Sequence, residues 1–334
     1  MKQTLSILAI GMVLFTGCRK NEPETFYGPD LNDLFGPFSI VQNITVSHNP
    51  INFALDGNLS FNGELSKNTD WVITITGANS GAIRNITGSE RILSSANATW
   101  NGGANSYPAF SIEDVYIEIT FPNEEGSPVL YDTVAITGEK IDDGVLITGF
   151  ENGAGSNWVV FNQTTVTGEI VCGNGESAKG TCHYSVEGVV GWDWAKGSVS
   201  IQPDAGTFPL QSSPNNLFFN MALKPVESVG PTSSFIQIWF DEDENDDGIF
   251  DPNTEDRYIY EYWTTDTIWE LVSVEYASLT QDENGDPLVT NGNGLPEPSK
   301  LLSVNLFFLS DPNNGNAKAL FDHIIFTSNG PYNP

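Results

Sequence analysis

Alternation of apolar and polar residues dominates the chain after residue 37 and predicts β-strands. In the first part, five segments alternate with a period of two: Ile40–Val46, Asn58–Leu65, Trp71–Thr76, Val115–Phe121 and Leu130–Ile136. This period is expected of strands that bury one face and expose the other. Gly, Pro, Asn and Thr are abundant between such segments, which favours short strands and turns over helices.

Five strands within about a hundred residues fit an immunoglobulin-like β-sandwich, which we predict for residues 38–140. The segment lacks the Cys, Trp, Cys signature of antibody domains, so this similarity concerns architecture only. Trp71 and Trp100 lie in strand-like surroundings. We assign both side chains to the core.

Longer and more aromatic strands follow the linker-like segment Glu139–Gly144. Their landmarks, in order, are Phe-Glu-Asn-Gly at 150–153, Cys182–Gly188, Leu217–Leu223, Phe235–Phe240, Trp269–Val274 and Phe321–Phe326. The opening Phe-Glu-x-Gly strand, the tryptophan strand and the closing Phe-Asp-x-Ile strand resemble the galactose-binding-like jelly roll of many carbohydrate-binding modules. We therefore predict an all-β chain whose second domain, residues 141–334, is a galactose-binding-like jelly-roll β-sandwich.

Charge excludes one class of partner. The chain has 13 Lys and Arg against 43 Asp and Glu, a formal net charge of -30. Such a surface repels phosphate backbones, so a nucleic-acid partner is excluded. With 39% hydrophobic and only 17% charged residues, the chain can still bury a core, and its acidity belongs to the surface.

The N-terminus has the features of a secretory signal, with Lys2 as the positive region and Leu5–Phe15 as the apolar region. Residues 14–18, Leu-Phe-Thr-Gly-Cys, resemble a bacterial lipobox, which implies a signal peptide over residues 1–17 and a lipidated N-terminus at Cys18. An ordinary signal peptide with an incidental cysteine is the alternative. Acyl chains on Cys18 would anchor the chain to a membrane without a transmembrane helix.

A polar stretch rich in Gly and Pro at residues 18–37 is predicted to be a tether. Acidic residues soon after the cysteine, Glu22 and Glu24, resemble the surface-export signal of Bacteroidota lipoproteins. The basic pair Arg19 and Lys20 departs from that pattern. We expect display on the outer face of the outer membrane.

The other two cysteines, Cys172 and Cys182, enclose a Gly-rich segment. In an exported chain we expect them to form a disulfide that closes a local hairpin or loop. A zinc site would need two more soft ligands, and the three histidines are scattered along the sequence.

An acidic run at residues 241–256 predicts a calcium site, because so many carboxylates repel one another unless a cation draws them together. Counted from Asp243, the spacing resembles the start of an EF-hand calcium loop, with Gly248 at position 6. The predicted ligands are Asp243, Asn245, Asp247, the Ile249 carbonyl, Asp251 and Glu255, which comes one place after position 12. Strand-like flanks replace the helices of an EF-hand, and a solvated acidic turn is the alternative.

A second structural cation is implied by the jelly-roll resemblance. In such modules a cation often joins the first strand to the last through one carboxylate from each. The matching residues here are Glu151 and Asp322. The alternative is that they are two unrelated surface carboxylates.

Sugar recognition needs flat apolar side chains for the C–H faces of the pyranose ring, with planar polar groups for the hydroxyls. Trp192 and Trp194, two residues apart and bounded by glycines, would share one face of a strand as a stacking platform, unless both are buried as core. Trp158 and Trp263 are the second candidates. Trp239 and Trp269 lie in β-rich runs, and we assign them to packing.

Motifs of enzymes are absent from the sequence: there is no Gly-x-Ser-x-Gly elbow, no His-Glu-x-x-His helix and no phosphate loop. Acidic residues are too numerous for their spacing to single out a glycosidase pair. The sequence therefore favours a binding protein over a glycoside hydrolase.

The lipobox, tether, spacer and C-terminal module together resemble the surface glycan-binding lipoproteins of Bacteroidota polysaccharide-utilisation systems. The resemblance implies a non-catalytic outer-membrane lipoprotein that captures a polysaccharide and passes it to enzymes, a TonB-dependent transporter and the transporter's lipoprotein partner. The negative charge favours a neutral polysaccharide. An adhesin or structural surface lipoprotein that binds protein or matrix is the alternative.

Overall fold

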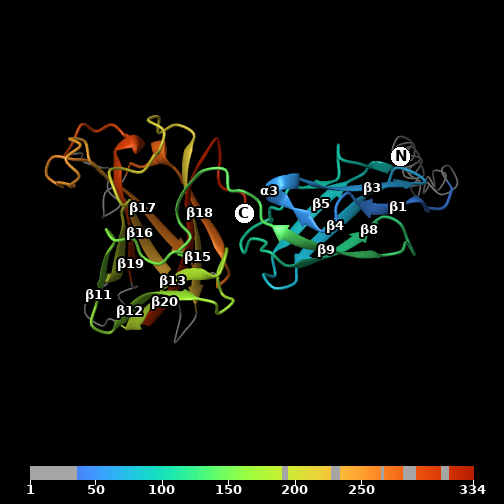
Figure 1. Ribbon diagram of the computed structural model, residues 1–334, viewed down its shortest axis with the longest axis horizontal. Coiled ribbons are helices and arrows are strands. Elements are labelled where there is room, and N and C mark those ends of the chain that lie inside the picture. Colours follow the sequence, from blue (N-terminus) through green and yellow to red (C-terminus); the bar gives the residue numbers. More distant parts are fainter. Residues whose placement is uncertain (1–35, 190–194, 227–233, 265–266, 281–290, 310–315) are drawn as a thin grey trace, which may run out of the picture.

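The computed structural model contains two β-sandwiches, arranged side by side along the long axis of the molecule (Figure 1). It describes residues 36–189, 195–226, 234–264, 267–280, 291–309 and 316–334. The all-β prediction is confirmed. Within the described residues, no helix is long and apolar enough to cross a membrane.

The first sandwich packs two sheets around its own core. One sheet has the order β2-β9-β8-β4-β5, formed by Ile51–Asn52, Leu130–Gly138, Asp114–Thr120, Trp71–Gly77 and Ile83–Gly88. The other has the order β1-β3-β6, formed by Ile40–Val46, Leu59–Leu65 and Ile92–Leu93, with β7 (Thr99–Trp100) also paired to β3. A short helix, α3 (Phe53–Asp56), follows β2.

Strict alternation in this domain produces the core that the sequence predicts. Strands β3 and β4 bury every second side chain, and the other side chains are half-buried. Trp71 and Trp100 are 0% and 1% exposed, so their assignment to the core is correct. The Trp100 ring lies edge-on to Phe53 and Phe110.

The second sandwich also has two sheets. The first has the order β12-β13-β20-β15-β18, formed by Val166–Cys172, Cys182–Val189, Asn316–Ser328, Leu217–Val226 and Glu270–Glu275, with β10 (Val145–Thr148) paired to β20. The second has the order β11-β14-β19-β16-β17, formed by Val159–Asn162, Ala195–Ile201, Leu301–Leu309, Ser234–Glu242 and Arg257–Thr264. Two 3-10 turns, η1 (Tyr276–Ser278) and η2 (Pro298–Lys300), lie in its connections.

One predicted strand of this domain is wrong. The Phe-Glu-Asn-Gly segment at 150–153 is a turn, and the strand ends before it, at Thr148. Phe150 and Gly153 have φ of 61° and 75°, in the left-handed region, and the Gly153 N–H donates to the Phe150 carbonyl. The Phe150 ring nevertheless reaches the core, where it stacks on Tyr184.

A disulfide joins Cys172 and Cys182 across the β12–β13 hairpin. The two residues are directly paired in the ladder, at the end where β12 stops and β13 begins. The bond therefore closes the Gly-rich connection between these strands.

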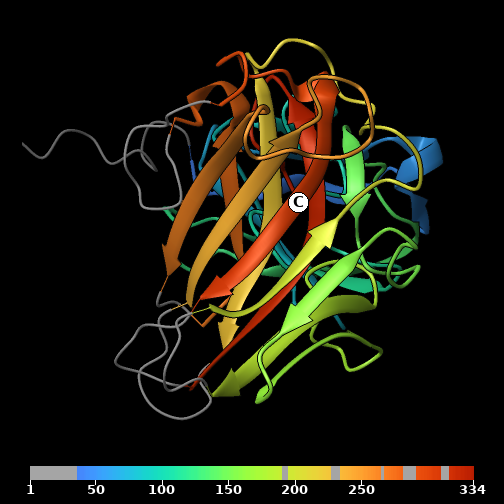
Figure 2. The ribbon, with the colours of Figure 1, turned by 90° about the vertical axis from the view of Figure 1, so that its left-hand side faces the viewer.

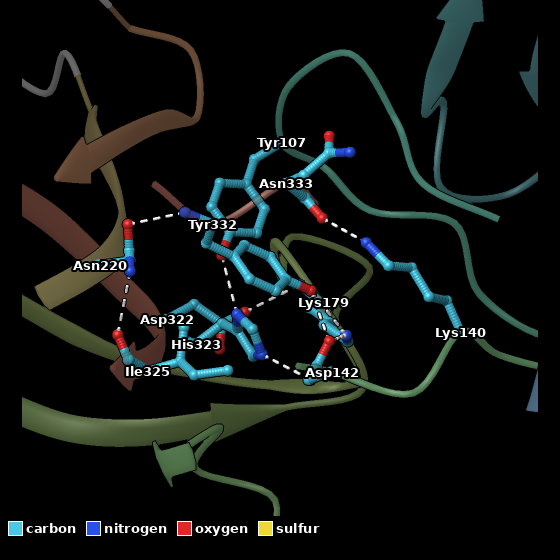
Figure 3. A network of polar contacts seen from close by, with 10 residues as sticks. All are labelled: Tyr107, Lys140, Asp142, Lys179, Asn220, Asp322, His323, Ile325, Tyr332 and Asn333. Carbon is cyan, nitrogen blue, oxygen red and sulfur yellow. Dashed lines mark hydrogen bonds and ion pairs between the residues drawn. The ribbon is translucent and has the colours of Figure 1, made fainter. Parts of the chain in front are cut away.

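The two domains meet at a buried polar network (Figure 3). Tyr107 of the first domain and His323 of β20 share a hydrogen bond of 2.8 Å between Oη and Nδ1. His323 Nε2 lies 2.9 Å from Oδ2 of Asp142, in the linker. Lys179 forms an ion pair with Asp142, and the Tyr332 hydroxyl donates to Asp142 over 2.5 Å. Linker, β20 and C-terminal segment thus converge on Asp142.

The segment Tyr332–Pro334 adds contacts to both domains. The Tyr332 ring stacks on Tyr107 at a centroid distance of 6.1 Å. The Ala104 N–H donates to the Pro334 carbonyl over 2.5 Å, and Lys140 Nζ donates to the Asn333 carbonyl over 2.7 Å. These bonds fix the first domain, the linker and the second domain against one another.

Candidate functional site

The sheet β11-β14-β19-β16-β17 turns one face to the core and the other away from the first domain (Figures 1 and 2). Ile236, Ile238 and Phe240 of β16 are core residues. Because side chains alternate along a strand, their neighbours lie on the opposite face. We call this face the outer face; it carries Val159, Phe161, Ser198, Ser200, Ser303, Asn305, Phe307, Gln237, Trp239, Asp241, Arg257, Ile259, Glu261 and Trp263.

Strand pairing aligns five of these side chains in a row across the sheet. In order from β11 to β17 they are Phe161, Ser198, Phe307, Gln237 and Glu261. Strands lie about 4.8 Å apart, so the row spans roughly 19 Å. Aromatic, hydroxyl, amide and carboxylate groups therefore follow one another along a single line.

Large aromatic rings are exposed at both edges of the outer face. Trp263 on β17 is 55% exposed and Phe161 on β11 is 50% exposed. Of the two candidate platform tryptophans that the structure describes, Trp158 and Trp263, it places Trp263 on this face. The tyrosines that alternate with it, Tyr258, Tyr260 and Tyr262, pack against the core.

Trp239 packs against other side chains, as predicted, but it does so on the outer face. It is half-buried there, with its ring centroid 4.1 Å from that of Phe307. Its core-facing neighbours Ile238 and Phe240 explain this, since alternation puts Trp239 on the other side. Trp269 is 7% exposed and packs in the cluster between the domains, as predicted.

Hydrogen bonds between polar side chains fix their positions in the middle of the outer face in the absence of a ligand. Gln237 donates from Nε2 to Glu261 Oε1 over 2.6 Å and accepts at Oε1 from the Trp239 indole N–H over 3.0 Å. Asn305 and Ser303 donate to Asp241 Oδ2. Such a preformed arrangement reduces the entropy that would be lost on ordering these groups around a ligand.

Electrostatically, the outer face offers no spare positive charge among its described residues. Its one basic side chain, Arg257, pairs with Asp241 through two contacts, Nε to Oδ1 at 2.5 Å and NH2 to Oδ2 at 3.0 Å. Glu261 adds a negative charge next to Gln237. The face is suited to neutral hydroxyl-rich ligands and disfavours anionic ones.

Trp158 lies elsewhere, at one end of the second sandwich. It lines a cavity of about 750 Å³ between the segments 146–158 and 202–209. Its ring is edge-on to Phe150. Trp158 and Trp263 therefore mark two separate places in the domain. Trp192 and Trp194, between β13 and β14, lie outside the described residues, as does Cys18.

Residues 243–256 of the acidic run form the loop between β16 and β17, at one end of the same sheet (Figure 2); we call this loop the acidic loop. Asp243 and Glu255 are buried within it. Asp243 accepts hydrogen bonds from the N–H groups of Asp247 and Gly248, and Glu255 accepts from those of Asn245 and Asp251. Ile249 is exposed, as are the side chains of Asn245, Asp247 and Asp251. Glu255 stands at position 13, one place after the position where a glutamate ligand is expected. Its carboxylate is nevertheless buried inside the loop.

Among the residues that the structure describes, no three His, Cys, Asp or Glu side chains are grouped as a metal site. The ligand set predicted for the acidic loop combines carboxylate oxygens with the Asn245 amide oxygen and the Ile249 carbonyl oxygen. Calcium accepts such mixed oxygen ligands.

Glu151 and Asp322 both hold the segment that precedes β13. Glu151 accepts hydrogen bonds from the N–H groups of Thr181 and Cys182, and Asp322 accepts from those of Ala178 and Lys179. Burial raises the pKa of Asp322 to about 7, and the charge of Glu151 adds to the shift. A proton or a cation beside Asp322 would relieve this cost.

Sequence reasoning missed several residues of the outer face, among them Phe161, Gln237, Asn305 and Phe307. Alternation within Leu301–Leu309 could have separated Phe307 from its core neighbours Leu306 and Phe308. The alignment of these side chains in one row depends on which strands pair. No local pattern in the sequence contains that information.

Comparisons with known proteins find neither a matching family model nor a matching curated protein. Among solved structures, the chain is similar to a family 11 carbohydrate-binding module from Clostridium thermocellum in complex with a β-1,3-1,4-mixed-linked tetrasaccharide. The identity is 13% and the TM-score 0.38, over 57% of this chain and 98% of that one.

Two further similarities concern an SGBP-B from a complex xyloglucan utilization locus in Bacteroides uniformis and the CBM22-1 xylan-binding domain of Xyn10C from Paenibacillus barcinonensis. The first has 15% identity and a TM-score of 0.38, over 87% of this chain and 73% of that one. The second has 13% identity and a TM-score of 0.31, over 56% of this chain and 97% of that one. At TM-scores below 0.5, function has to be argued from the residues of the chain itself.

Proposed function

We propose that the chain is a non-catalytic surface lipoprotein that binds a polysaccharide along the outer face. The observation that carries this proposal is the row from Phe161 to Glu261, with Trp263 beside it. Aromatic rings give the C–H faces of sugars an apolar surface, and the amide and hydroxyl groups between them can bond sugar hydroxyls. The row is long enough for several pyranose units.

The proposed ligand is a neutral glycan. Arg257 is committed to Asp241, and Glu261 together with the net charge of -30 would repel uronic or sulfated polymers. Contact energy must then come from stacking and from hydrogen bonds to neutral groups.

Cys18 would anchor the mature chain to the outer membrane, with the first domain as a spacer. In this arrangement the outer face points away from the first domain, which suits capture of a polymer outside the cell. We propose that the captured glycan passes to degrading enzymes and to a TonB-dependent transporter with its lipoprotein partner.

Trp263→Ala is expected to weaken polysaccharide binding by about 2 kcal/mol, roughly 30-fold, because the most exposed ring of the outer face is lost. Retardation in polysaccharide-containing native gels would select a glycan, and calorimetry would measure its affinity. Since Trp263 is 55% exposed, circular dichroism should show an unchanged fold.

Trp158→Ala is the matched comparison, because this ring lines the end cavity instead of the outer face. Loss of binding in Trp158→Ala with normal binding in Trp263→Ala would move the site to that cavity. The same assay on Trp192→Ala and Trp194→Ala tests the platform predicted there. If the wild type binds no polysaccharide but binds host protein or matrix, the adhesin alternative replaces this proposal.

We also propose calcium as a structural cofactor. Asp243, Asn245, Asp247, the Ile249 carbonyl, Asp251 and Glu255 would hold one ion, and Glu151 with Asp322 would contribute to a second. All these donors are hard oxygens, which calcium prefers. The buried carboxylates of Asp243, Glu255 and Asp322 support the proposal, because a cation would offset their desolvation.

Calcium is expected to raise the melting temperature. A ligand that binds only the folded state at a hundredfold excess over its Kd adds about 2.7 kcal/mol. Asp243→Ala should remove most of the rise and Asp322→Asn the remainder, as followed by scanning calorimetry with calcium or chelator. An unchanged melting temperature, with no metal found by elemental analysis of the wild type, would refute the proposal.

A further inference from the structure

A stack of four side chains joins the outer face to the acidic loop. The Phe307 and Trp239 rings lie 4.1 Å apart, centroid to centroid. The Arg257 guanidinium carbon lies 4.4 Å from the centroid of the Trp239 ring and 4.5 Å from that of Phe250. Phe250 belongs to the acidic loop, whereas Phe307 lies in the middle of the sheet. The stack is therefore a direct physical connection between two parts of the domain.

Arg257 is fixed in the middle of this stack. Its two contacts with Asp241 hold the plane of the guanidinium group. Asp241 is itself buried and accepts from Ser303 and Asn305. Guanidinium groups stack favourably on aromatic rings, so Arg257 stabilises a single position of the Trp239 ring.

Phe250 is the outermost member of the stack and the one without a strand to hold it. It is half-buried, and its neighbour Ile249 is exposed. A loop conformation that withdrew Phe250 would expose Arg257 to water on that side. Hydration of the guanidinium would compete with its contact with Trp239.

We infer that Phe250 and Arg257 are positioning residues for Trp239, so that the conformation of the acidic loop sets the affinity of the outer face for its ligand. This inference rests on the proposed function and deepens it. The acidic loop then belongs to the glycan-binding site without touching the glycan.

Phe250→Ala tests the inference. Its affinity for the polysaccharide selected with the wild type should fall about five- to tenfold, with a melting temperature close to that of the wild type. Phe250→Tyr, which keeps a ring over Arg257, should restore the affinity. If Phe250 has a purely structural role, Phe250→Ala should lower the melting temperature and leave the affinity unchanged.

The effect of Phe250 on Trp239 can also be measured by NMR in the absence of a ligand. The indole N–H signal of Trp239, assigned by its loss in Trp239→Phe, should shift in Phe250→Ala and stay in place in Leu295→Ala. Leu295 is a suitable control because it is an exposed apolar residue of a neighbouring loop.

Two outcomes separate the inference from the proposed function. If the wild type binds polysaccharide and Phe250→Ala changes neither the affinity nor the Trp239 signal, the inference is wrong and the proposed function stands. If the wild type binds no polysaccharide, the proposed function fails and glycan affinity is no longer the property that the loop sets. The inference is then wrong as stated, whatever the Trp239 signal does.

Discussion

Tyr107→Ala is expected to unfold in two separate thermal transitions, whereas the wild type unfolds in one. Tyr107 is buried between the domains, where it shares a hydrogen bond with His323 and stacks on Tyr332. Truncation of a buried aromatic side chain costs about 3–5 kcal/mol. Because Tyr107 connects the two domains, its truncation should weaken their coupling in unfolding and also lower the overall stability.

Scanning calorimetry would resolve the two transitions, and small-angle scattering would detect a wider range of domain arrangements. Tyr131→Ala is the matched control, since Tyr131 lies in the same domain but is 74% exposed. The free energy of unfolding of that variant should stay within about 0.5 kcal/mol of the wild-type value. A single unshifted transition in Tyr107→Ala would mean that the network of Figure 3 does not couple the domains.

Coupled domains matter for the proposed function. With the first domain, the linker and Tyr332–Pro334 fixed together, the outer face keeps one direction relative to the spacer. If the chain is anchored as proposed, a flexible joint would let this face turn toward the membrane. In that arrangement the network would keep the outer face directed away from the first domain.

Local pattern predicted several strands of the first domain, because β3, β4 and β8 bury every second residue. Trp71–Gly77 is the plainest case, with alternate buried and half-buried side chains along its whole length. Val159–Asn162 was missed because it is a short edge strand with exposed side chains and no alternation of burial. The turn at 150–153 was taken for a strand because its aromatic residue is buried, although its backbone is not extended.

The candidate site could be predicted only in part. Trp263 was found because it alternates with a ladder of tyrosines, which is a local pattern. The row that contains Phe161, Gln237 and Phe307 forms when β11, β16 and β19 enter one sheet, from positions far apart in the chain. Trp239 shows that alternation must be applied residue by residue, since an apolar run such as Phe235–Phe240 does not bury all its members.

The interdomain network illustrates the same limit. Asp142 lies in a segment that was read as a linker, and its partners His323 and Tyr332 follow roughly 180 to 190 residues later. Their contact depends on where the chain returns in β20 and in the C-terminal segment. A single sequence does not reveal such a return.

Stability is expected to fall as the pH rises from about 5 to 8, because of Glu242. This side chain is fully buried, and burial raises its pKa from 4.5 to about 8, with the charges of Glu297 and Asp256 adding to the shift. Its Oε1 accepts from the Tyr276 hydroxyl and the Glu297 N–H, but its Oε2 has no partner among the described residues.

The sign follows from proton linkage. Between the unfolded pKa of 4.5 and the folded value near 8, the folded chain holds a proton that the unfolded chain has released. The stabilising effect of the neutral form is complete below pH 4.5 and is lost as the pH rises toward 8. A pKa shift of this size lowers the free energy of unfolding by roughly 3–5 kcal/mol between pH 4.5 and pH 8.

Glu242→Gln should therefore unfold at a higher denaturant concentration than the wild type at pH 8 and at nearly the same concentration at pH 4.5. Gln is neutral at every pH and keeps the shape of the protonated side chain, so it removes the linkage without opening a cavity. Glu118→Gln is the control, because Glu118 is exposed on the first domain. This variant should unfold at the same denaturant concentration as the wild type at both pH values. If the stability of Glu242→Gln depends on pH in the same way as that of the wild type, Glu242 stays ionised in the folded chain. A cation, or a rearrangement that brings water to Oε2, would then stabilise its charge.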